Sequence, residues 1–266
     1  MINLLYIFIF GLIIGSFLTM LTYRLPKGLS LLGRSFCDNC KEKISWKQNI
    51  PLFYFIYTGG RSKCCKRKIS FRYPLIEIAT AVFFVFSFWL FKQNEILNPV
   101  AIYWKLSLGV IYFPVFLLLL GIFIALTIID IEHGILPDIL LKVLFIPIIF
   151  FLFVNHTLLF SHLLWGLLAF IFFLFIYMIT NQKGMGFGDV KLVFLLGILL
   201  GFPAITSSLF LSFLLGSVVG LILILGRRFK FGRPIAFGPF LLFCAWVSFF
   251  LGDTLLVYYL DLLANI

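Results

Sequence analysis

Apolar segments long enough to cross a lipid bilayer constrain this chain more than any other feature of its sequence. Hydrophobic residues make up 63% of its 266 residues, whereas soluble domains are about 45–50% apolar. A spanning helix needs roughly 17–25 apolar residues. Eight runs are candidates, of which the sixth is short: Ile2–Leu21, Leu75–Phe91, Leu106–Ile129, Ile139–Val154, Leu158–Ile179, Val190–Leu200, Ala204–Leu225 and Ile235–Leu251. The sequence therefore predicts an all-α polytopic membrane protein of about eight transmembrane helices, and the tail Thr254–Ile266 is a candidate for a ninth, partial helix.

The basic residues predict the orientation of these helices. Twelve of the 21 Lys and Arg residues lie in the segment Arg24–Arg72, and loops rich in Lys and Arg stay on the cytoplasmic side. This places the N-terminus outside. Alternation then places all the other basic residues inside except Lys92 and Lys105. Because topology accounts for the charge of +11, we expect membrane lipid and no nucleic acid as a partner.

The chain divides into two regions by composition. Residues 1–74 comprise one apolar run and a polar loop of about fifty residues, much longer than ordinary connections. Residues 75–266 contain the other apolar runs with short connections. We therefore predict an N-terminal helix with a long cytoplasmic loop, followed by a transmembrane bundle.

Four of the five cysteines lie in this loop and suggest a metal site. Cys37-x-x-Cys40 has the spacing of a turn that presents two thiolates to one zinc ion. The segments "CKEKISWKQNIPL" and "CKRKISFRYPL" resemble two copies of one knuckle, in which Cys65 matches Cys40. By the same match, Ser62 stands where the partner of Cys37 should be.

The spare thiol, Cys64, is two residues from that position. We predict a structural zinc bound by Cys37, Cys40, Cys65 and a strained Cys64, because adjacent cysteines rarely both reach one metal comfortably. The alternative is a degenerate site without metal, in which the apolar stretch "IPLFYFIY" supports the loop. A disulfide is not expected in a cytoplasmic loop.

Two acids lie at the ends of apolar runs. Asp130 ends the third run in "LTIIDIEHGILPDIL", and Asp189 precedes the sixth in "NQKGMGFGDVKL". The predicted topology places both at the cytoplasmic face, and acids in membrane segments are functional candidates by default. Two carboxylates that share one proton could activate water for peptide hydrolysis. Gly186 and Gly188 would let a substrate backbone approach closely and would adopt angles barred to other residues.

Other roles of these acids stay open at this stage. Asp130 could be an interfacial or capping residue, and Asp189 could be a helix N-cap. Asp138 after Pro137 is expected to cap the fourth run, and His133 to be interfacial. The alternative function is a transporter or membrane scaffold in which the Asp pair relays protons or ions.

Taken together, the motifs resemble a known family. "GMGFGDVKL" resembles the signature of the GxGD aspartyl proteases. The segments "GLIIGSFLTMLTYRLP", "CDNC…RKISFRYPLIE", "IDIEHGILPDIL" and "RPIAFGPFL" are similar, in this order, to the type IV prepilin peptidases. The resemblance implies Asp130 and Asp189 as the catalytic pair, Gly186 and Gly188 as the GxGD glycines, and no cofactor requirement for proteolysis.

The resemblance also implies substrates and a location. Family members cleave the basic leader of prepilin and pseudopilin precursors after a glycine, at the cytoplasmic face of the bacterial inner membrane. Many then N-methylate the new N-terminal residue, usually Phe, with S-adenosylmethionine. Thr19 stands where Asn is common and Ser62 where a zinc-type cysteine is expected. Both departures fall in the N-terminal region and therefore bear on methylation more than on proteolysis.

Overall fold

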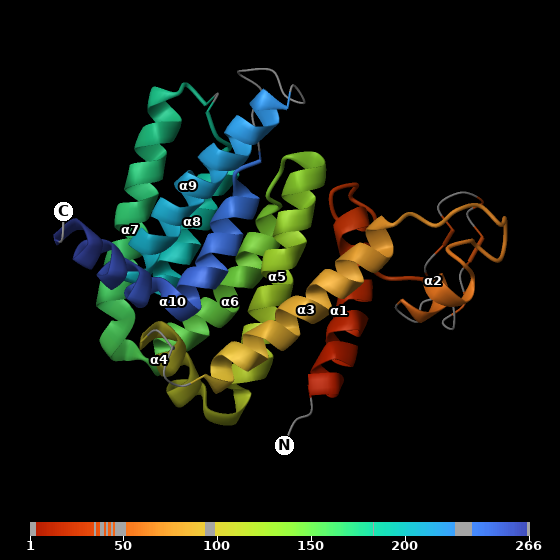
Figure 1. Ribbon diagram of the computed structural model, residues 1–266, viewed down its shortest axis with the longest axis horizontal. Coiled ribbons are helices and arrows are strands. Elements are labelled where there is room, and N and C mark those ends of the chain that lie inside the picture. Colours follow the sequence, from red (N-terminus) through yellow and green to blue (C-terminus); the bar gives the residue numbers. More distant parts are fainter. Residues whose placement is uncertain are drawn as a thin grey trace. The chain divides into compact units, whose positions relative to one another are not determined.

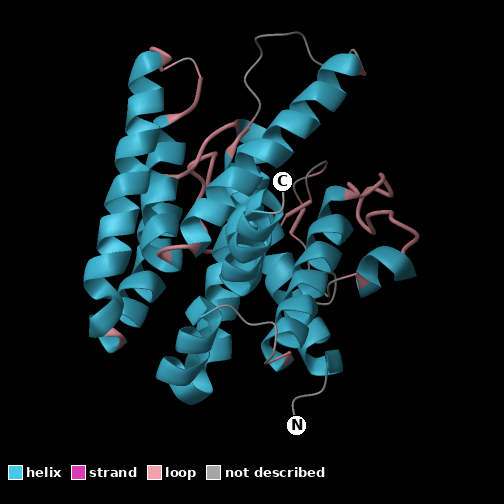
Figure 2. Ribbon diagram, turned by 60° about the vertical axis from the view of Figure 1, so that its left-hand side comes forward, coloured by secondary structure: helices cyan, strands magenta, loops and turns pink. Residues whose placement is uncertain are grey.

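The computed structural model describes residues 4–34, 36–37, 40, 42–43, 45, 52–93, 99–182, 184–226 and 236–264, and most of these residues lie in helices. Within these ranges there is no strand, only two isolated antiparallel bridges (Figures 1 and 2). The helices are α1 (Leu4–Arg24), α2 (Phe53–Tyr57), α3 (Arg72–Lys92), α4 (Pro99–Leu108), the 3-10 turn η2 (Gly109–Ile111), α5 (Tyr112–His133), α6 (Asp138–Val154), α7 (His156–Ile179), α8 (Phe187–Leu200), α9 (Ala204–Leu225) and α10 (Gly238–Ala264). The predicted all-α class is confirmed.

Among the described residues, each of the eight apolar runs contains helix, and six helical stretches are long and apolar enough to cross a membrane. Helices α6 and α8 have 17 and 14 residues, so a count of eight spans stays a prediction. The third run begins earlier than predicted, because α4 and η2 extend it to the stretch Val100–His133. The tail Thr254–Ile266 does not start a separate helix, since α10 continues to Ala264.

The structure falls into two compact units, Met1–Trp89 and Leu90–Ile266. Their boundary lies inside α3, near its C-terminal end. The sequence-based domain boundary after residue 74 lies near the start of the same helix and stays a prediction.

In the N-terminal unit, small residues let α1 contact the backbone of α3. A Cβ added at Gly11 would lie 2.5 Å from the Ala81 Cα, and one at Gly15 would lie 2.6 Å from the Glu77 Cα. The two glycines are four residues apart, the spacing that permits close helix contacts in membranes. Only glycine leaves room for such an approach, so α1 and α3 form a tightly packed pair.

In the C-terminal unit, an aromatic core and a second glycine contact hold the helices. Phe91, Phe116 and Phe249 surround one another with ring centroids 5.0–6.3 Å apart. A Cβ at Gly197 of α8 would lie 2.6 Å from the Gly166 Cα of α7. Helix α8 is therefore the most enclosed helix of this unit, with Val190, Leu192 and Val193 fully buried at its start.

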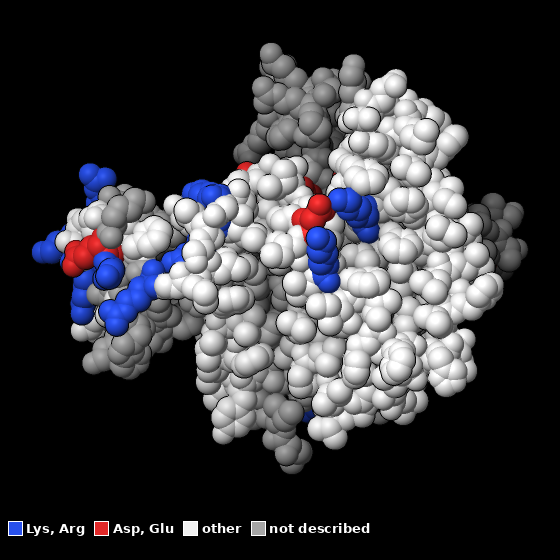
Figure 3. All heavy atoms as spheres, turned by 180° about the vertical axis from the view of Figure 1, so that it is seen from behind, with Lys and Arg blue, Asp and Glu red and all other residues white. Residues whose placement is uncertain are grey.

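The outer surface of the helices is apolar. Large apolar side chains such as Phe160, Phe175 and Leu225 are 62–81% exposed. In Figure 3 the broad helical face is white, and Lys and Arg side chains gather over the loop of the N-terminal unit and at one small group on the helices. This surface is the one expected for helices that contact lipid.

Candidate active site and metal centre

Asp130 lies in the last turn of α5 and is buried. Asp130 is 6% exposed, and its Oδ2 has no hydrogen-bond partner among the described residues. The helix ends just beyond it, because Gly134 adopts a left-handed φ of 66° and donates its N–H to the Asp130 carbonyl at 2.9 Å. Asp130 is therefore neither an N-cap nor an exposed interfacial residue.

Asp189 lies in the first turn of α8 and is equally buried, at 7% exposure. Its Oδ2 accepts the Gly186 N–H at 3.2 Å, and its own N–H donates to the Gly186 carbonyl at 3.1 Å. The carboxylate thus caps the helix from its third position, although Asp189 is not the N-cap residue itself. It also lies near enough to Asp130 for the two charges to interact. The two predicted acids therefore meet in one buried site.

A third helix end completes this site. Gly238, at the start of α10, lies against the Asp130 carboxyl. A Cβ at Gly238 would lie 2.6 Å from the Asp130 Oδ2 and 3.4 Å from the Leu136 Cδ2. Gly238 was not among the predicted site residues. Gly238 lies in the segment "RPIAFGPFL", which resembles the family. The contact with Asp130 could not be predicted, because the two residues are more than one hundred positions apart in the sequence.

The glycines of the GxGD motif have ordinary backbone angles, and their importance lies in the room that a missing Cβ leaves. Gly186 has an ordinary φ of −78°, and neither it nor Gly188 has a positive φ. The expectation of angles barred to other residues was wrong. Gly188 instead lets Leu136 approach, since a Cβ there would lie 3.0 Å from the Leu136 Cβ. The space around Gly186 is more open, because a Cβ added there would lie 3.7 Å from the nearest side-chain atom beyond its chain neighbours, the Asp189 Oδ2.

Beside the buried pair, an exposed ion pair links α6 and α8. The Lys191 Nζ lies 2.7 Å from the Asp138 Oδ1. The hydrogen bond and charge of Lys191 hold the pKa of Asp138 below its usual range. Asp138 is the first residue of α6 and Pro137 is its N-cap, so the predicted capping role of Asp138 was wrong. His133 is exposed in the last turn of α5.

The loop of the N-terminal unit contains two knuckles with the same hydrogen bonds at an offset of 25 residues. Phe36 pairs with Lys43 in one antiparallel bridge, and Arg61 pairs with Lys68 in the other. Inside the first bridge, the Cys37 N–H donates to the Glu42 carbonyl at 2.8 Å. Inside the second, the Ser62 N–H donates to the Arg67 carbonyl at 2.9 Å. Ser62 therefore occupies the backbone position that Cys37 holds in the first knuckle.

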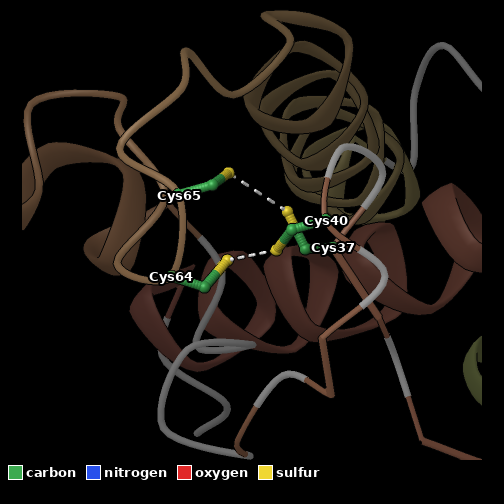
Figure 4. A group of neighbouring side chains, drawn as sticks. All are labelled: Cys37, Cys40, Cys64 and Cys65. Carbon is green, nitrogen blue, oxygen red and sulfur yellow. Dashed lines mark hydrogen bonds between the residues drawn. The ribbon is translucent and has the colours of Figure 1, made fainter.

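The four loop thiols nevertheless gather in one group (Figure 4). The Sγ atoms of Cys37, Cys40, Cys64 and Cys65 all lie within 4.8 Å of one another. Cys37 and Cys65 are 3.8 Å apart, and Cys40 and Cys64 are 3.0 Å apart. The hydrogen bond to Cys64 raises the pKa of Cys40 to about 12. Four sulfur donors at this separation fit a tetrahedral zinc site, in which each Zn–S distance is about 2.3 Å.

Cys64 reaches the group although it is adjacent to Cys65. The Ser62 Oγ lies 2.8 Å from the Cys64 Sγ and 3.7 Å from the Cys37 Sγ. The hydroxyl thus borders the thiols without replacing one. Both adjacent thiols lie inside the cluster, so the sulfur that the second knuckle lacks at position 62 is supplied from position 64.

Comparisons with known proteins identify the family of this chain. The bacterial peptidase A24 N-terminal domain matches residues 9–91, and the type IV leader peptidase family matches residues 117–221. Relatives named prepilin leader peptidase/N-methyltransferase include those of Pseudomonas aeruginosa (32% identical, covering 94% of this chain and 91% of the relative) and Aeromonas hydrophila (31%, 96% and 92%). The relative of the same name from Klebsiella pneumoniae is 32% identical over 78% of this chain and 89% of its own. No solved structure matches. The chain belongs to the prepilin leader peptidase/N-methyltransferase family.

Proposed function

We propose that this protein is an intramembrane aspartyl endopeptidase that removes the basic leader of type IV prepilin and pseudopilin precursors, cutting after a glycine. The observation that carries the proposal is the meeting of Asp130 and Asp189 as two buried carboxylates at the ends of α5 and α8. The names of the relatives supply the substrate class.

The chemistry follows from the burial of two acids together. In a site of low dielectric, two neighbouring carboxylates do not both ionise readily, so the pair holds one proton between its members. The ionised member takes a proton from water, and the protonated member donates a hydrogen bond to the scissile carbonyl. The unpartnered Asp130 Oδ2 is a suitable atom for one of these contacts. The open side of Gly186 offers space for the substrate backbone.

A prepilin precursor has an apolar segment that can lie in the bilayer like another helix. Its cleavage site would then lie at the boundary between the basic leader and the bilayer. Basic residues favour the cytoplasmic side of the membrane. We place the active site at the cytoplasmic face of the bacterial inner membrane, with the N-terminus of the enzyme outside.

Asp130→Asn and Asp189→Asn test the protease assignment in the full-length enzyme, co-expressed with a precursor that carries a basic leader, Gly and then Phe. Each variant should leave the precursor uncut. Glu132→Gln is the matched control, since this exposed acid lies on the same helix two residues beyond Asp130. Normal processing by either Asp variant would refute the assignment.

We further propose that the enzyme N-methylates the new N-terminal residue with S-adenosylmethionine, which supplies the methyl group. The basis is the joint name of the relatives and the match of residues 9–91 to the N-terminal domain. Mass spectrometry of the mature product should show the mass of one added methyl group. A cut but unmodified N-terminus, with the methyl donor present, would refute methylation and leave the protease assignment intact.

The cysteine cluster would hold a structural zinc ion that ties the two knuckles together. We propose Cys37, Cys40, Cys64 and Cys65 as the ligands, since their four sulfurs lie within bonding reach of one central ion. Cys64→Ala should therefore lose zinc. Adding Ser62→Cys to that variant should restore zinc, because position 62 is the equivalent of Cys37 in the second knuckle. Full zinc content in Cys64→Ala alone would exclude Cys64 as a ligand.

A further inference from the structure

The short helix α2 of the N-terminal unit exposes an apolar face. Phe53, Ile56 and Tyr57 are 64%, 69% and 72% exposed. They are spaced i, i+3 and i+4, so they share one side of the helix. The Phe53 and Tyr57 rings stack there with centroids 6.1 Å apart. Large apolar side chains that are exposed together mark a surface that contacts a partner or a membrane.

The opposite side of α2 packs on the second cysteine knuckle. The Phe55 ring lies against Gly60, where an added Cβ would be 3.1 Å from the Phe55 Cζ. The same ring contacts Phe71 edge-on, with centroids 5.4 Å apart. The Tyr54 hydroxyl accepts the Lys63 N–H at 3.3 Å. These contacts fix which side of α2 stays uncovered.

A hydrogen bond sets the level of α2 along the membrane helices. The Leu52 N–H, directly before α2, donates to the Glu77 Oε2 at 2.8 Å. Glu77 lies five residues beyond Arg72, the first residue of α3, which is a candidate span. A basic residue at the end of a span lies at the headgroup level, and a rise of 1.5 Å per residue places Glu77 about 7.5 Å inside that end. Interfacial helices bury their apolar face to a depth of about 5–10 Å, so α2 begins at the depth of such a helix.

The exposed apolar side of α3 leads to the same surface. Leu75, Ile78 and Val82 are 69%, 41% and 52% exposed, and their spacing places them on one side of the helix. Phe71 is 76% exposed and extends this side by one turn, because its carbonyl accepts the Leu75 N–H at 3.1 Å. Its ring contacts Phe55 of α2. An apolar surface thus continues from the lipid-facing side of α3 to α2.

The polar part of the same loop is strongly basic. Lys and Arg side chains gather over it in Figure 3. Among the loop residues that the structure describes, the exposed acid is Glu42, and the exposed basic residues are Lys27, Arg34, Lys43, Arg61, Lys63, Lys66, Arg67 and Lys68. Five of these eight lie at positions 61–68, shortly after α2. Basic residues beside an exposed apolar face are typical of segments that bind anionic lipid.

We propose that the exposed face of α2 and the Phe71 ring insert into the bilayer that surrounds the enzyme, and that the basic knuckle binds anionic phospholipid headgroups beside them. Tyr57 suits this level, because Tyr is enriched where a ring is in lipid and its hydroxyl is in water. A soluble partner could reach a face at this depth only by displacing lipid, which is why we choose the bilayer as the occupant. The inserted face holds the cysteine cluster at the headgroup level. This role does not depend on either proposed activity.

Photolabelling from the lipid tests the insertion. The full-length enzyme is reconstituted as one copy per nanodisc with a phospholipid that carries a diazirine in its acyl chain, and labelled peptides are identified by mass spectrometry. In the wild type, the peptide with Phe53–Tyr57 should be labelled to within about threefold of the peptide with Ile78 and Val82, the internal reference. Ile56→Asp should lower the α2 label about tenfold or more, because a charge opposes burial in lipid. Ile56→Leu is the matched control and should keep the label.

The choice of headgroup tests the electrostatic part. The α2 label should be about threefold higher in nanodiscs of equal parts phosphatidylcholine and phosphatidylglycerol than in phosphatidylcholine alone. Replacing Lys66, Arg67 and Lys68 together by Gln should remove this difference, and so should high salt, which screens the attraction. Lys92→Gln is the control, because this exposed residue lies at the other end of α3. Equal labelling of the wild type in both lipids would overturn the choice of an anionic surface.

Three other results would overturn the insertion itself. The first is a wild-type α2 peptide without label while the α3 reference is labelled. The second is a label that Ile56→Asp leaves unchanged. The third is an α2 face that is unlabelled in single-copy nanodiscs but crosslinks to a second enzyme in nanodiscs with two copies, since the face would then be an interface between copies. The melting temperature in detergent should be the same for Ile56→Asp and the wild type, because the side chain is 69% exposed, and a large fall would assign Ile56 to the fold instead.

Discussion

The aspartate site and the cysteine cluster are built in opposite ways. Asp130 and Asp189 are buried at helix ends, where the Asp130 backbone carbonyl accepts the Gly134 N–H and the Asp189 carboxylate accepts the Gly186 N–H. The cysteines lie in a loop with two isolated bridges, and Cys40 and Cys64 are exposed. The helical bundle supports the first site by itself. The second lies in a loop whose short helix α2 has no buried residue, and we propose that a zinc ion bound by its thiols holds it together.

This contrast predicts that the two sites respond to different perturbations. They lie in different units, Met1–Trp89 and Leu90–Ile266. Removal of zinc should affect the structure of the N-terminal unit. Substitutions at the helix ends of the C-terminal unit should instead affect proteolysis. Experiments that separate the two effects are therefore the sharpest tests of the comparison.

Zinc removal should give the largest effect. A structural zinc contributes directly to the folding of its domain, so chelation should speed trypsin cleavage within the cysteine loop by about tenfold or more and should abolish methylation. Leader cleavage should stay near its original rate. The measurements are limited proteolysis, mass spectrometry of the product and a precursor-processing assay. Cys244→Ala is the control variant and should respond to chelation as the wild type does, because this buried thiol lies in α10 outside the cluster. Equal loss of cleavage and methylation on chelation would contradict the separation of the two sites.

Gly238→Ala should give the next largest effect, on the other site. Its Cβ would lie 2.6 Å from the Asp130 Oδ2, so the carboxyl must move. A displacement of about 1 Å can cost roughly 100-fold in rate, and we expect a comparable fall in leader cleavage with zinc unchanged. Gly216→Ala in α9 is the control, since the nearest atoms to its Cβ would be those of the Phe237 ring, at 3.3 Å, and of the Phe240 ring, at 3.8 Å. Wild-type cleavage by Gly238→Ala would show that the contact with Asp130 has no catalytic role.

The sequence predicts the elements of both sites better than the contacts between them. Apolar runs locate the helices, and charge alternation brings Asp130 and Asp189 to one predicted face, because both signals are local. The knuckle match is likewise visible along the chain, and it placed Ser62 in the position of a missing cysteine. Local patterns of this kind were enough to predict most of the helices, the aspartate pair and the four loop cysteines.

The contacts that the sequence did not predict depend on tertiary geometry. The approach of Gly238 to Asp130 joins α10 to α5, and no periodicity along the chain encodes it. The role of Gly188 likewise depends on its contact with Leu136, which lies between α5 and α6. Pro137 rather than Asp138 is the N-cap residue of α6, and the Asp138 side chain pairs with Lys191 of α8. Each difference arises where two distant segments compete for one side chain or one space.

Gly15→Ala should have a moderate effect, confined to the N-terminal unit. Its Cβ would lie 2.6 Å from the Glu77 Cα, a backbone atom that cannot rotate away. Such overpacking typically costs about 1–3 kcal/mol, and separation of α1 from α3 should reduce methylation more than cleavage. Thermal unfolding and the two activity assays measure this. Ile13→Ala is the control, since that side chain is half exposed on the same helix; loss of cleavage without loss of methylation would contradict the assignment of effects to units.

Lys191→Met should have the smallest effect, although Lys191 is only two residues from Asp189. Exposed ion pairs contribute little to stability, and Lys191 and Asp138 are 39% and 62% exposed. Because Lys191 lowers the pKa of Asp138, the contribution of the pair is present at neutral pH and is lost as the pH falls below about 4. The wild type and Lys191→Met should therefore differ slightly in melting temperature at pH 7 and converge in acid. If Lys191→Met is as stable as the wild type but cuts the precursor much more slowly, Lys191 acts on the substrate or the buried pair, and the active site extends from the enclosed helix ends to this exposed charge.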